Sequence, residues 1–549
     1  MFDYKTLIYN SAKDVLDGLE IGDVTASDAF CDYCIPCFKF AKLLRKAPAM
    51  IAADAAAKIK IDGIKAEALN GYLNFTIERD SFVRRAFEDS GEYMPLSGKT
   101  VCIDYSSVNI AKPFHIGHLM TTVIGGSLCK IFKYLGAEVV GINHLGDWGT
   151  QFGGLISAYR NWGDEDRLTA RGLDELLELY VRYHNEAEKD EKVAAEAREW
   201  SKKIESGDPY AVGLFERFKA ITLEQAKKVY KRLNIEFDSY LGESFYVDKV
   251  PAVEKKLEQK SLLKISDGAE IVELTDDMPP ALIRRSDGAS LYIARDLAAA
   301  YYRHENYSFD KCLYVVASHQ ALHFKQLFKV LELLGEKWAG DMIHVSFGMV
   351  SVEGMALSTR KGNVLYLSDV LDSAVEKAAA IIAERNPDLN DKSRVAESVG
   401  VGAVVFGALY DGRQKDKNFS LEAALNFDGE TGPYVQYTHA RCRSVLSKAG
   451  YSKSQKVDYK LLTDDEAYDV VKLLADFDEN ILSAAVKYEP SVVSRRLVKI
   501  CQAFNRFYNA DRIMCGGETE KARLELTLRV ADALKRGLML VLLDAPEKM

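Results

Sequence analysis

Residues 104–118 read D-Y-S-S-V-N-I-A-K-P-F-H-I-G-H, directly after the apolar run at residues 101–103. That run is typical of a buried strand, and the apolar spacing of residues 119–135 predicts a helix that ends at Gly136. The quoted stretch is therefore expected to be a loop that joins a strand to a helix. We call residues 104–118 the signature loop.

The signature loop places a lysine and two histidines at the start of the predicted helix. A helix N-terminus points free N–H groups outward and favours anions, so Lys112, His115 and His118 are candidates for holding a triphosphate. Gly117 leaves room for a phosphate or a flat ring to approach the backbone. The alternative is a helix that starts with two histidines by coincidence.

Strand and helix patterns alternate after residue 98. The strands that we expect are residues 101–105, 138–143, 313–318 and 343–350. Such alternation predicts an α/β fold with a parallel sheet that is covered on both faces, and ligands bind at the carboxyl ends of its strands.

The chain is too long for one hydrophobic core, with 549 residues. We expect a first domain at residues 1–97, in which residues 71–77 alternate as a strand does, and a nucleotide-binding core at residues 98–390. A charged, mostly helical insertion at about residues 160–285 interrupts this core, and residues 174–206 form its long helical segment. Residues 395–549 have helical periodicity, notably at 492–510 and 524–543, and predict an all-helical domain.

Composition points to a globular protein of the cytoplasm. The chain is 48% hydrophobic and 28% charged and has a net charge of −9, which argues against a protein that coats nucleic acid without selection. We find no apolar stretch of membrane-spanning length and no signal-peptide pattern at the start.

Three of the nine cysteines form a C-x-x-C-x-x-C run at Cys31, Cys34 and Cys37. An iron–sulfur run would place a fourth cysteine where Ala41 stands. A spacing of three also matches one face of a helix, so we expect buried free thiols and no metal site.

The signature loop and several later blocks resemble the arginyl-tRNA synthetases of class I. The blocks follow the family's order from about residue 70 to the end: N-H-L-G-D-W-G-T-Q-F-G (143–153), L-Y-I-A-R-D (291–296), A-S-H-Q-A-L-H-F (317–324), L-S-T-R-K-G-N (357–363), T-G-P-Y-V-Q-Y (431–437) and A-P-E-K-M (545–549). The resemblance implies a Rossmann-like class I synthetase core with a connective insertion, an N-terminal α+β domain that meets the tRNA D-loop, and a helical anticodon-binding domain. It also implies that the chain is an arginine–tRNA ligase.

In this family the two histidines bind ATP, and Mg²⁺ accompanies ATP as a substrate metal. The resemblance assigns the ATP site to His115, Gly117, His118, Met349, Val350 and Ser358. The loop that corresponds to the class I K-M-S-K-S motif reads A-L-S-T-R here, so Thr359 stands where the class usually has its lysine. Lys112, which precedes H-I-G-H as in several arginyl enzymes, is one candidate for the catalytic lysine. Lys361 is the other candidate. The resemblance also places Ser358 and Arg360 among the catalytic residues of that loop, for which a solvated basic turn is the alternative.

Recognition of arginine requires a carboxylate and preferably an aromatic face, because guanidinium is a planar cation that stays charged. Tyr292 and Asp296 are four residues apart in a predicted helix and hence on one face. By resemblance they hold the substrate arginine together with Gln320, while His118, Ser107, Val108 and Asn109 line the end nearest the α-amino group. Glu243 is a candidate for a second carboxylate.

Aromatic, basic and amide side chains suited to unstacked RNA bases lie in the last domain. The resemblance assigns the anticodon contacts to Tyr434, Gln436, Tyr437, His439, Arg441 and Arg443, with Met549 at the end of the chain. Tyr72 and Asn74 match positions that meet the D-loop. Structural tyrosines of a helical bundle are the alternative for Tyr434 and Tyr437.

The expected partners are ATP, L-arginine and tRNA-Arg, and we expect a monomer without a membrane contact, a bound cofactor or a structural metal. One rival function is that of another class I synthetase, or a nucleotidyl transferase that needs no tRNA. A second is a catalytically silent RNA-binding relative. The arginine-pocket residues argue against the first, and the presence of both histidines argues against the second.

Overall fold

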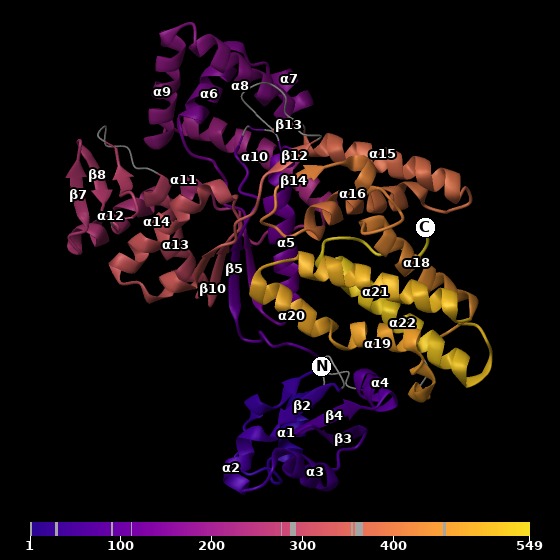
Figure 1. The fold of residues 1–549 in the computed structure, drawn as a ribbon. Helices are drawn as coiled ribbons and strands as arrows, with labels where there is room; N and C mark the ends of the chain where they lie inside the picture. Colours follow the sequence, from indigo (N-terminus) through magenta and orange to yellow (C-terminus); the bar gives the residue numbers. More distant parts are fainter. Residues whose placement is uncertain are drawn as a thin grey trace.

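The structure, a computed structural model, describes residues 3–27, 31–88, 92–110, 112, 114–275, 277–285, 292–352, 355–356, 366–453 and 457–549. Figure 1 shows a small unit at the N-terminus, a central sheet flanked by helices, and a large helical unit at the C-terminus. In the described part of the chain, no helix is both long and apolar enough to span a bilayer.

The N-terminal unit is a four-stranded antiparallel sheet with helices packed on it. Its strands are β1 (Thr25–Ala26), β2 (Tyr33–Pro36), β3 (Ile64–Leu69) and β4 (Tyr72–Ile77), in the order β1-β2-β4-β3. Its helices are α1 (Tyr4–Ala12), η1 (Ile21–Asp23), η2 (Cys37–Phe40), α2 (Ala41–Leu44), α3 (Pro48–Lys58) and α4 (Arg79–Glu88). The predicted strand at residues 71–77 is confirmed.

The helical arrangement expected for the three neighbouring cysteines is wrong. Cys34 lies in β2, where it pairs with Asn74 of β4, and Cys37 begins a 3-10 helix. Pairing of β2 with β4 therefore determines the structure around these cysteines, and their three-residue spacing does not indicate a helix. All three are free thiols, and only Cys37 is buried.

The central sheet is parallel, in the order β11-β10-β5-β6, and consists of β5 (Thr100–Asp104), β6 (Glu138–Ile142), β10 (Lys311–Tyr314) and β11 (Met342–His344). Helices α5 (Leu119–Tyr134), α13 (Tyr292–Tyr307), η5 (Ser318–Gln320), α14 (Ala321–Leu334) and η6 (Lys337–Asp341) connect or cover these strands. The predicted α/β fold with a parallel sheet is confirmed.

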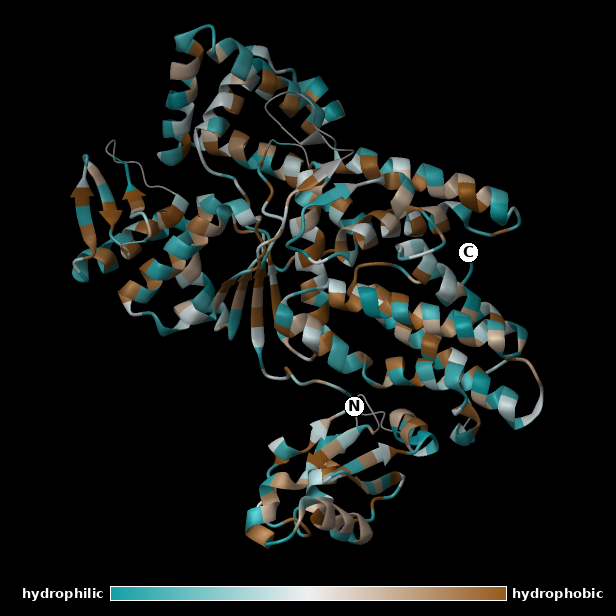
Figure 2. Ribbon diagram, viewed as in Figure 1, coloured by the Kyte–Doolittle hydropathy of each residue, from teal (hydrophilic) through white to brown (hydrophobic). Residues whose placement is uncertain are grey.

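Alternate residues of β5 enter different hydrophobic clusters, which is why the strand reads as a continuous apolar run. Val101 and Ile103 pack in the cluster that contains α5, and Cys102 packs with α13 and α14. A strand that is buried on both faces carries apolar residues at successive positions, and Figure 2 shows such brown stretches in the central strands, beside teal and white ones. β6 and β10 flank β5 on opposite sides, so the chain reverses its winding direction at the carboxyl end of β5, where such sheets bind ligands.

Two predicted strands were placed incorrectly. The one expected at residues 313–318 begins at Lys311 and ends at Tyr314, since residues 315–320 turn into η5. Residues 343–350 are split between β11 and β12 (Val350–Val352), which pairs with β13 (Met355–Ala356) and β14 (Lys417–Phe419) in a separate sheet. An apolar run alone does not mark where a chain leaves one sheet for another.

The insertion consists of helices followed by a small antiparallel sheet. The helices are α6 (Thr150–Trp162), α7 (Glu165–Arg171), α8 (Leu173–Ala187), α9 (Glu191–Glu205), α10 (Pro209–Arg232), α11 (Glu243–Tyr246), η4 (Val247–Lys249) and α12 (Val250–Gln259). The strands β7 (Leu263–Ser266), β8 (Ala269–Val272) and β9 (Ala281–Arg284) were not predicted, because each is only four residues long. Residues 174–206 form two helices and not one, since the Asp190 side chain caps α9 at the Lys192 N–H.

The C-terminal part is helical, as predicted, except for the strand β14 at Lys417–Phe419, which pairs with β12. Its helices are α15 (Leu367–Arg385), α16 (Lys392–Tyr410), α17 (Leu421–Ala424), α18 (Gly432–Lys448), η8 (Tyr459–Leu462), α19 (Asp465–Ala475), α20 (Phe477–Lys487), α21 (Ser491–Ala510) and α22 (Gly517–Leu540). The helix predicted from residue 524 begins earlier, because its polar first turns carry no apolar periodicity.

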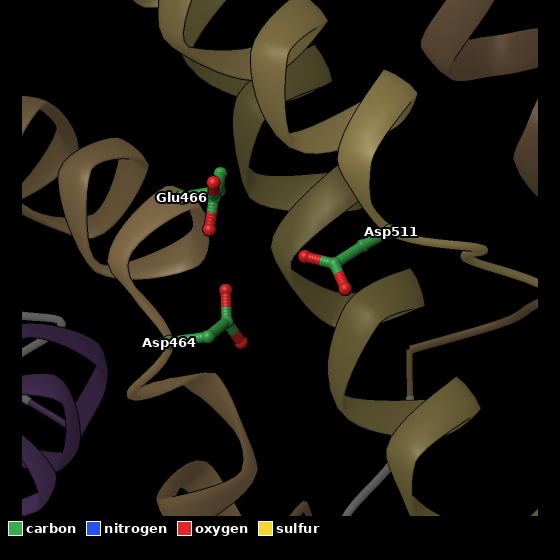
Figure 3. A group of neighbouring side chains, drawn as sticks. All are labelled: Asp464, Glu466 and Asp511. Carbon is green, nitrogen blue, oxygen red and sulfur yellow. The ribbon is translucent and has the colours of Figure 1, made fainter.

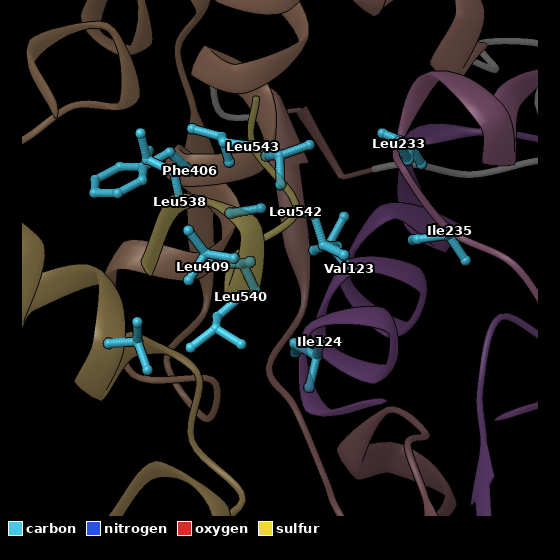
Figure 4. Close-up of a cluster of buried hydrophobic side chains, with 14 of the residues drawn as sticks. Val123, Ile124, Leu233, Ile235, Phe406, Leu409, Leu538, Leu540, Leu542 and Leu543 are labelled. Atoms are coloured by element: carbon cyan, nitrogen blue, oxygen red, sulfur yellow. The ribbon is translucent and has the colours of Figure 1, made fainter. Parts of the chain in front are cut away.

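The helical unit shares a hydrophobic core with α5. Figure 4 shows Leu540 and Leu542 of the C-terminal segment facing Val123 and Ile124 of α5. The Ser127 hydroxyl of α5 also donates a hydrogen bond of 2.7 Å to the Leu540 carbonyl. The helix that follows the signature loop is therefore held by the sheet on one side and by the C-terminal helices on the other.

Gly125→Ala is expected to destabilise the protein by about 1–3 kcal/mol, because the added Cβ would lie 2.2 Å from Cγ of the buried Tyr105. The matched control is Gly213→Ala in α10, where no heavy atom lies within 4 Å of the new Cβ. That change is expected to stabilise the helix by up to about 1 kcal/mol. Thermal unfolding midpoints of the two variants and of the parent measure the difference, and a lower midpoint for Gly213→Ala than for Gly125→Ala would contradict the packing argument.

Candidate active site

The signature loop leaves β5 through two residues in the left-handed region. Ser106 and Ser107 have φ values of 71° and 44°, which residues other than glycine seldom adopt. Hydrogen bonds fix both residues: the Ser106 N–H donates to the Thr121 hydroxyl at 2.9 Å, and the Ser107 hydroxyl donates to Asp104 at 3.1 Å. Strain that the surroundings hold in this way is typical of functional sites.

The two histidines of the loop order one another. Nδ1 of His115 accepts a hydrogen bond of 3.1 Å from the Gly117 N–H, and Nδ1 of His118 accepts one of 3.2 Å from the His115 N–H. Because Nδ1 is the acceptor in both rings, Nε2 of each neutral ring carries the proton and is a donor. A Cβ at residue 117 would lie 2.7 Å from the His115 ring, so that ring requires the glycine.

Both imidazoles are held in the neutral form. Burial lowers the pKa of His118 to about 3, with a further contribution from His115, and burial together with the charge of Lys112 lowers the pKa of His115. Phe114 stacks on the His118 ring with a centroid distance of 5.1 Å. The loop thus offers two neutral N–H donors and one ammonium group at the start of α5, a combination that suits phosphate oxygens.

A second group of polar side chains begins at Asp296 of α13, whose side chain is 27% exposed. One carboxylate oxygen accepts a hydrogen bond of 2.6 Å from Nε2 of His323, and the other lies 3.8 Å from Nε2 of His144. Burial raises the pKa of Asp296, but His323 and His144 outweigh it, so the net shift is downward. The group is an ionised carboxylate, open in part to solvent.

A buried ion pair fixes the orientation of His144. Arg303 and Asp104 are paired at 2.8 Å, with side chains that are 1% and 7% exposed. The Arg303 guanidinium also lies 3.2 Å from Nδ1 of His144. Since arginine only donates, Nδ1 must accept, and the His144 proton is on Nε2, toward Asp296. Burial and the charge of Arg303 lower the pKa of His144, in agreement with a neutral ring.

Glu243 is close to Asp296 but has a cation of its own. Its carboxylate lies 3.0 Å from Nε of Arg295, and the Arg295 guanidinium lies 4.9 Å from the ring centre of Tyr292. Burial raises the pKa of Glu243 to about 7 although Arg295 lowers it. The buried Asp147 holds the turn that carries Glu243, because it accepts hydrogen bonds of 2.9 and 2.8 Å from Ser244.

The remaining predicted residues of the core differ in position. Val108 is buried, Asn109 bridges to Gly146, and Gln320 is exposed in η5 at the carboxyl end of β10. Met349 is exposed and Val350 begins β12. Ser358, Arg360 and Lys361 lie outside the described residues.

The predicted tRNA residues of α18 fall into buried and accessible groups. Gln436 and His439 are fully buried and form hydrogen bonds with the backbone carbonyls of Asp544 and Pro546 in the C-terminal segment. Both side chains thus hold that segment in place, and their contact with tRNA stays a prediction. Tyr437 is 41% exposed, and the Arg441 guanidinium lies 4.9 Å from its ring centre.

The other predicted tRNA residues are half-buried or lie in the N-terminal unit. Tyr434 accepts a hydrogen bond from Asn505, Arg443 pairs with Glu547, and the Met549 carbonyl accepts one from Asn386. Tyr72 is 40% exposed against Phe38, and Asn74 accepts a bond from Cys31.

Among the residues that the structure describes, one group of carboxylates has the spacing of a metal site: Asp464, Glu466 and Asp511 (Figure 3). The structure gives two of them other functions, since Asp464 caps α19 at the Ala467 N–H and Asp511 pairs with Arg523 at 2.6 Å. None of the three residues is buried, and acidic groups near a surface are commonly found together without an ion, so we assign no metal to them.

Four further residues of the site were not predicted from the sequence: His144, His323, Arg303 and Asp104. His144 and His323 belong to the quoted sequence blocks and follow the strands β6 and β10. Their position after predicted strands could have marked them as site residues. Nothing comparable marks Arg303 or Asp104, because charged residues in a helix and at a strand end are usually exposed.

Comparison with known proteins gives three matching family models. They are described as tRNA synthetases class I (R), catalytic domain, over residues 87–421, DALR anticodon binding domain over residues 435–549, and Arginyl tRNA synthetase N terminal domain over residues 5–77.

Relatives match over the full length. The chain is 47% identical to the arginine–tRNA ligase of Clostridioides difficile and 44% identical to that of Halothermothrix orenii, with 100% of each chain covered. Among solved structures, Thermus thermophilus arginyl-tRNA synthetase is similar with a TM-score of 0.82 at 25% identity, and 100% of both chains is covered. The predicted resemblance is confirmed, and the chain belongs to the arginyl-tRNA synthetases, which are class I arginine–tRNA ligases.

Proposed function

We propose that this enzyme binds the guanidinium group of L-arginine at Asp296 and ATP at His115 and His118, and transfers the activated arginine to tRNA-Arg. The observation that carries the proposal is the ionised, partly exposed Asp296, which lies between two histidines beyond the carboxyl end of the parallel sheet. A carboxylate in this setting needs a cationic partner, and a planar guanidinium fits both of its oxygens.

Arginine binding at Asp296 requires a change at His323. The imidazole now donates to the oxygen that an incoming guanidinium would use. We propose that the substrate displaces this bond while the His144 N–H stays beside the other oxygen. Tyr292 and Gln320 would line the remaining sides, with Glu243 as a second carboxylate whose charge Arg295 already balances.

The backbone of arginine would lie against the left-handed turn of the signature loop. Ser107, Val108 and Asn109 follow Asp104, which joins the Arg303 and His144 network to this turn. One chain of contacts therefore connects the residues proposed to bind the α-amino group with those proposed to bind the guanidinium group. These contacts would fix the distance between the two binding positions, which matches the length of the arginine substrate.

ATP would bind at the start of α5 with Mg²⁺ on its phosphates. The two imidazole Nε2–H groups are proposed donors to phosphate oxygens, and Lys112 supplies the nearby positive charge that lowers the pKa of His115. Ser358, Arg360 and Lys361 would act on the same phosphates from their loop, with Gly117, Met349 and Val350 along the nucleotide. Donors fixed before the reaction stabilise the charge that builds up as pyrophosphate leaves.

We propose that tRNA contacts Tyr437 and Arg441 with its anticodon loop and Tyr72 and Asn74 with its D-loop. Exposed rings next to cations suit unstacked bases. Tyr434, Arg443 and Met549 would take part at the edge of the first surface. A monomer that acts in the cytoplasm completes the proposal.

Asp296→Asn is expected to weaken arginine use by more than about tenfold, roughly 1.4 kcal/mol, because a neutral amide does not balance a guanidinium. The KM for arginine in aminoacylation measures the effect, and thermal unfolding checks the fold. Glu305→Gln on the same helix is the matched control, since Glu305 is exposed and outside the site. A loss smaller than tenfold for Asp296→Asn, or equal losses for both variants, would contradict the assignment.

Arginine affinity is expected to rise with pH between about pH 6 and about pH 8, the range in which histidine titrates. Burial lowers the pKa of His323, but Asp296 outweighs it and the net shift is upward, so His323 is protonated and bound to Asp296 on the acid side of this range. As the pH rises through the raised pKa, the imidazolium loses its charge and stops competing with the guanidinium. His144 also faces Asp296, but burial and the charge of Arg303 lower its pKa, so its titration is shifted in the opposite direction to that of His323.

His323→Gln separates this effect from others, because the amide cannot become a cation. Its KM for arginine should vary less with pH than that of the parent. His319→Gln, a neighbouring exposed histidine, is the control and should keep the parent profile. An unchanged profile in His323→Gln would refute the competition.

Tyr437→Ala is expected to weaken tRNA affinity about tenfold, since stacking of one base on an aromatic ring contributes about 1–3 kcal/mol. Filter binding of tRNA-Arg measures it. The control is Tyr210→Ala in the insertion, where an exposed tyrosine is likewise covered by an arginine, Arg160, at 5.6 Å. Equal changes in both variants would place the effect outside the proposed anticodon surface.

A further inference from the structure

A cavity of about 920 Å³ lies between α5, the end of α10 and the segment that follows α10. Four lysines line it, and we call it the lysine cavity: Lys130 and Lys133 of α5, and Lys227 and Lys231 of α10. Neither the resemblance nor the proposed substrate sites include these residues. The volume is within the usual range for small-molecule sites.

The lysine cavity has an excess of positive charge. Within the described ranges, none of its four ammonium groups has a carboxylate within 4 Å, and Glu236 is the acid that lines the cavity with them. The neighbouring Lys228, by contrast, pairs with Glu224 at 3.1 Å and does not line the cavity. Lys133, Lys227 and Lys231 are exposed, whereas Lys130 is half-buried, and burial lowers the pKa of Lys130 although Asp544 and Glu236 raise it. A polyanion would balance the excess of positive charge.

Aromatic rings form the apolar side of the cavity. Phe237 lies 5.5 Å from Tyr240 and stacks on Tyr105 at 4.4 Å, and the Lys227 ammonium lies 4.9 Å from the Tyr240 ring centre. Rings next to ammonium groups suit a flat base with phosphates attached, because the base stacks while the phosphates meet the cations.

We propose that the lysine cavity binds a nucleoside polyphosphate. A concave site favours a free nucleotide over the backbone of a folded tRNA, which presents its phosphates on a convex surface. The four lysines would bind the phosphate chain, and Phe237 and Tyr240 the base. This site is separate from the ATP site at His115 and His118.

The back of the cavity is shared with the signature loop. Tyr230 lines the cavity, and its hydroxyl is 2.8 Å from the Ser106 hydroxyl and accepts a bond of 2.9 Å from Asn143. Phe114 of the loop packs edge-on against the same ring at 5.5 Å. Only the Tyr230 side chain would thus separate a ligand in the lysine cavity from Ser106 and Phe114 of the signature loop.

Calorimetric titration of the full chain with GTP, and separately with inorganic tripolyphosphate, tests the proposal. A non-hydrolysable arginyl-adenylate analogue occupies the active site, and Mg²⁺ is left out so that it does not bind the probes. Lys227→Gln and Lys231→Gln are each expected to weaken GTP binding about three- to fivefold, the effect of about 1 kcal/mol for one ion pair. Lys228→Gln on the same helix is the matched control and should bind as the parent does.

Three results would overturn the proposal. The first is no GTP binding to the parent at millimolar concentration, and the second is the same affinity in all three variants. The third is an unchanged GTP affinity together with weaker tRNA binding in Lys227→Gln and Lys231→Gln, which would make the cavity a contact for the tRNA backbone. Equal affinities for GTP and tripolyphosphate would overturn the assignment of the base, and tighter binding of GTP supports it.

Discussion

The buried ion pair between Arg303 and Asp104 is the interaction on which the geometry of the candidate active site depends. It joins a helix to the end of the central strand, where both side chains are almost without solvent. The desolvation of two such charges is offset only by close pairing and by further hydrogen bonds, and removal of one partner typically costs about 3–5 kcal/mol. Asp104 also accepts the Ser107 bond, and Arg303 sets the tautomer of His144. The ion pair thus fixes both the left-handed turn at Ser107 and the N–H donor of His144. These two functions explain why the enzyme keeps a buried pair whose desolvation costs free energy.

Most of the fold could be predicted because its elements carry their own periodicity. The run at residues 101–103 is apolar at every position since each face of the sheet is covered, and α21 and α22 alternate apolar and polar faces over several turns. The errors occurred where local pattern is weak. Three four-residue strands in the insertion have too few residues to establish a period, and Cys34 belongs to a strand because of a partner at Asn74, forty residues away in the chain.

The candidate site was predictable in part for the same reason. His115, His118 and Asp296 are chemically specific residues in recognisable blocks, and the structure places them beyond the carboxyl ends of the sheet. The sequence alone does not show which neighbouring side chains determine the protonation state of each of these three residues. Asp296 is ionised between two imidazoles, and Gln436 is fully buried, because of tertiary contacts between segments that are far apart in the chain.

The N-terminal unit is attached to the C-terminal helices by side-chain packing, which bears on the size of RNA that can reach both units. Helix α4 joins that unit to the C-terminal helices through Arg79 with Asp465, Phe82 with Tyr468, and Phe87 with Tyr459. The distance between the proposed D-loop and anticodon surfaces is thereby set by packed side chains and not by a flexible linker. The two proposed surfaces are therefore held at a fixed distance from one another. If both proposed surfaces bind RNA, an RNA with the right bases but a longer or shorter body between them would reach only one surface, and tRNA shape would then be a selection criterion in addition to the anticodon.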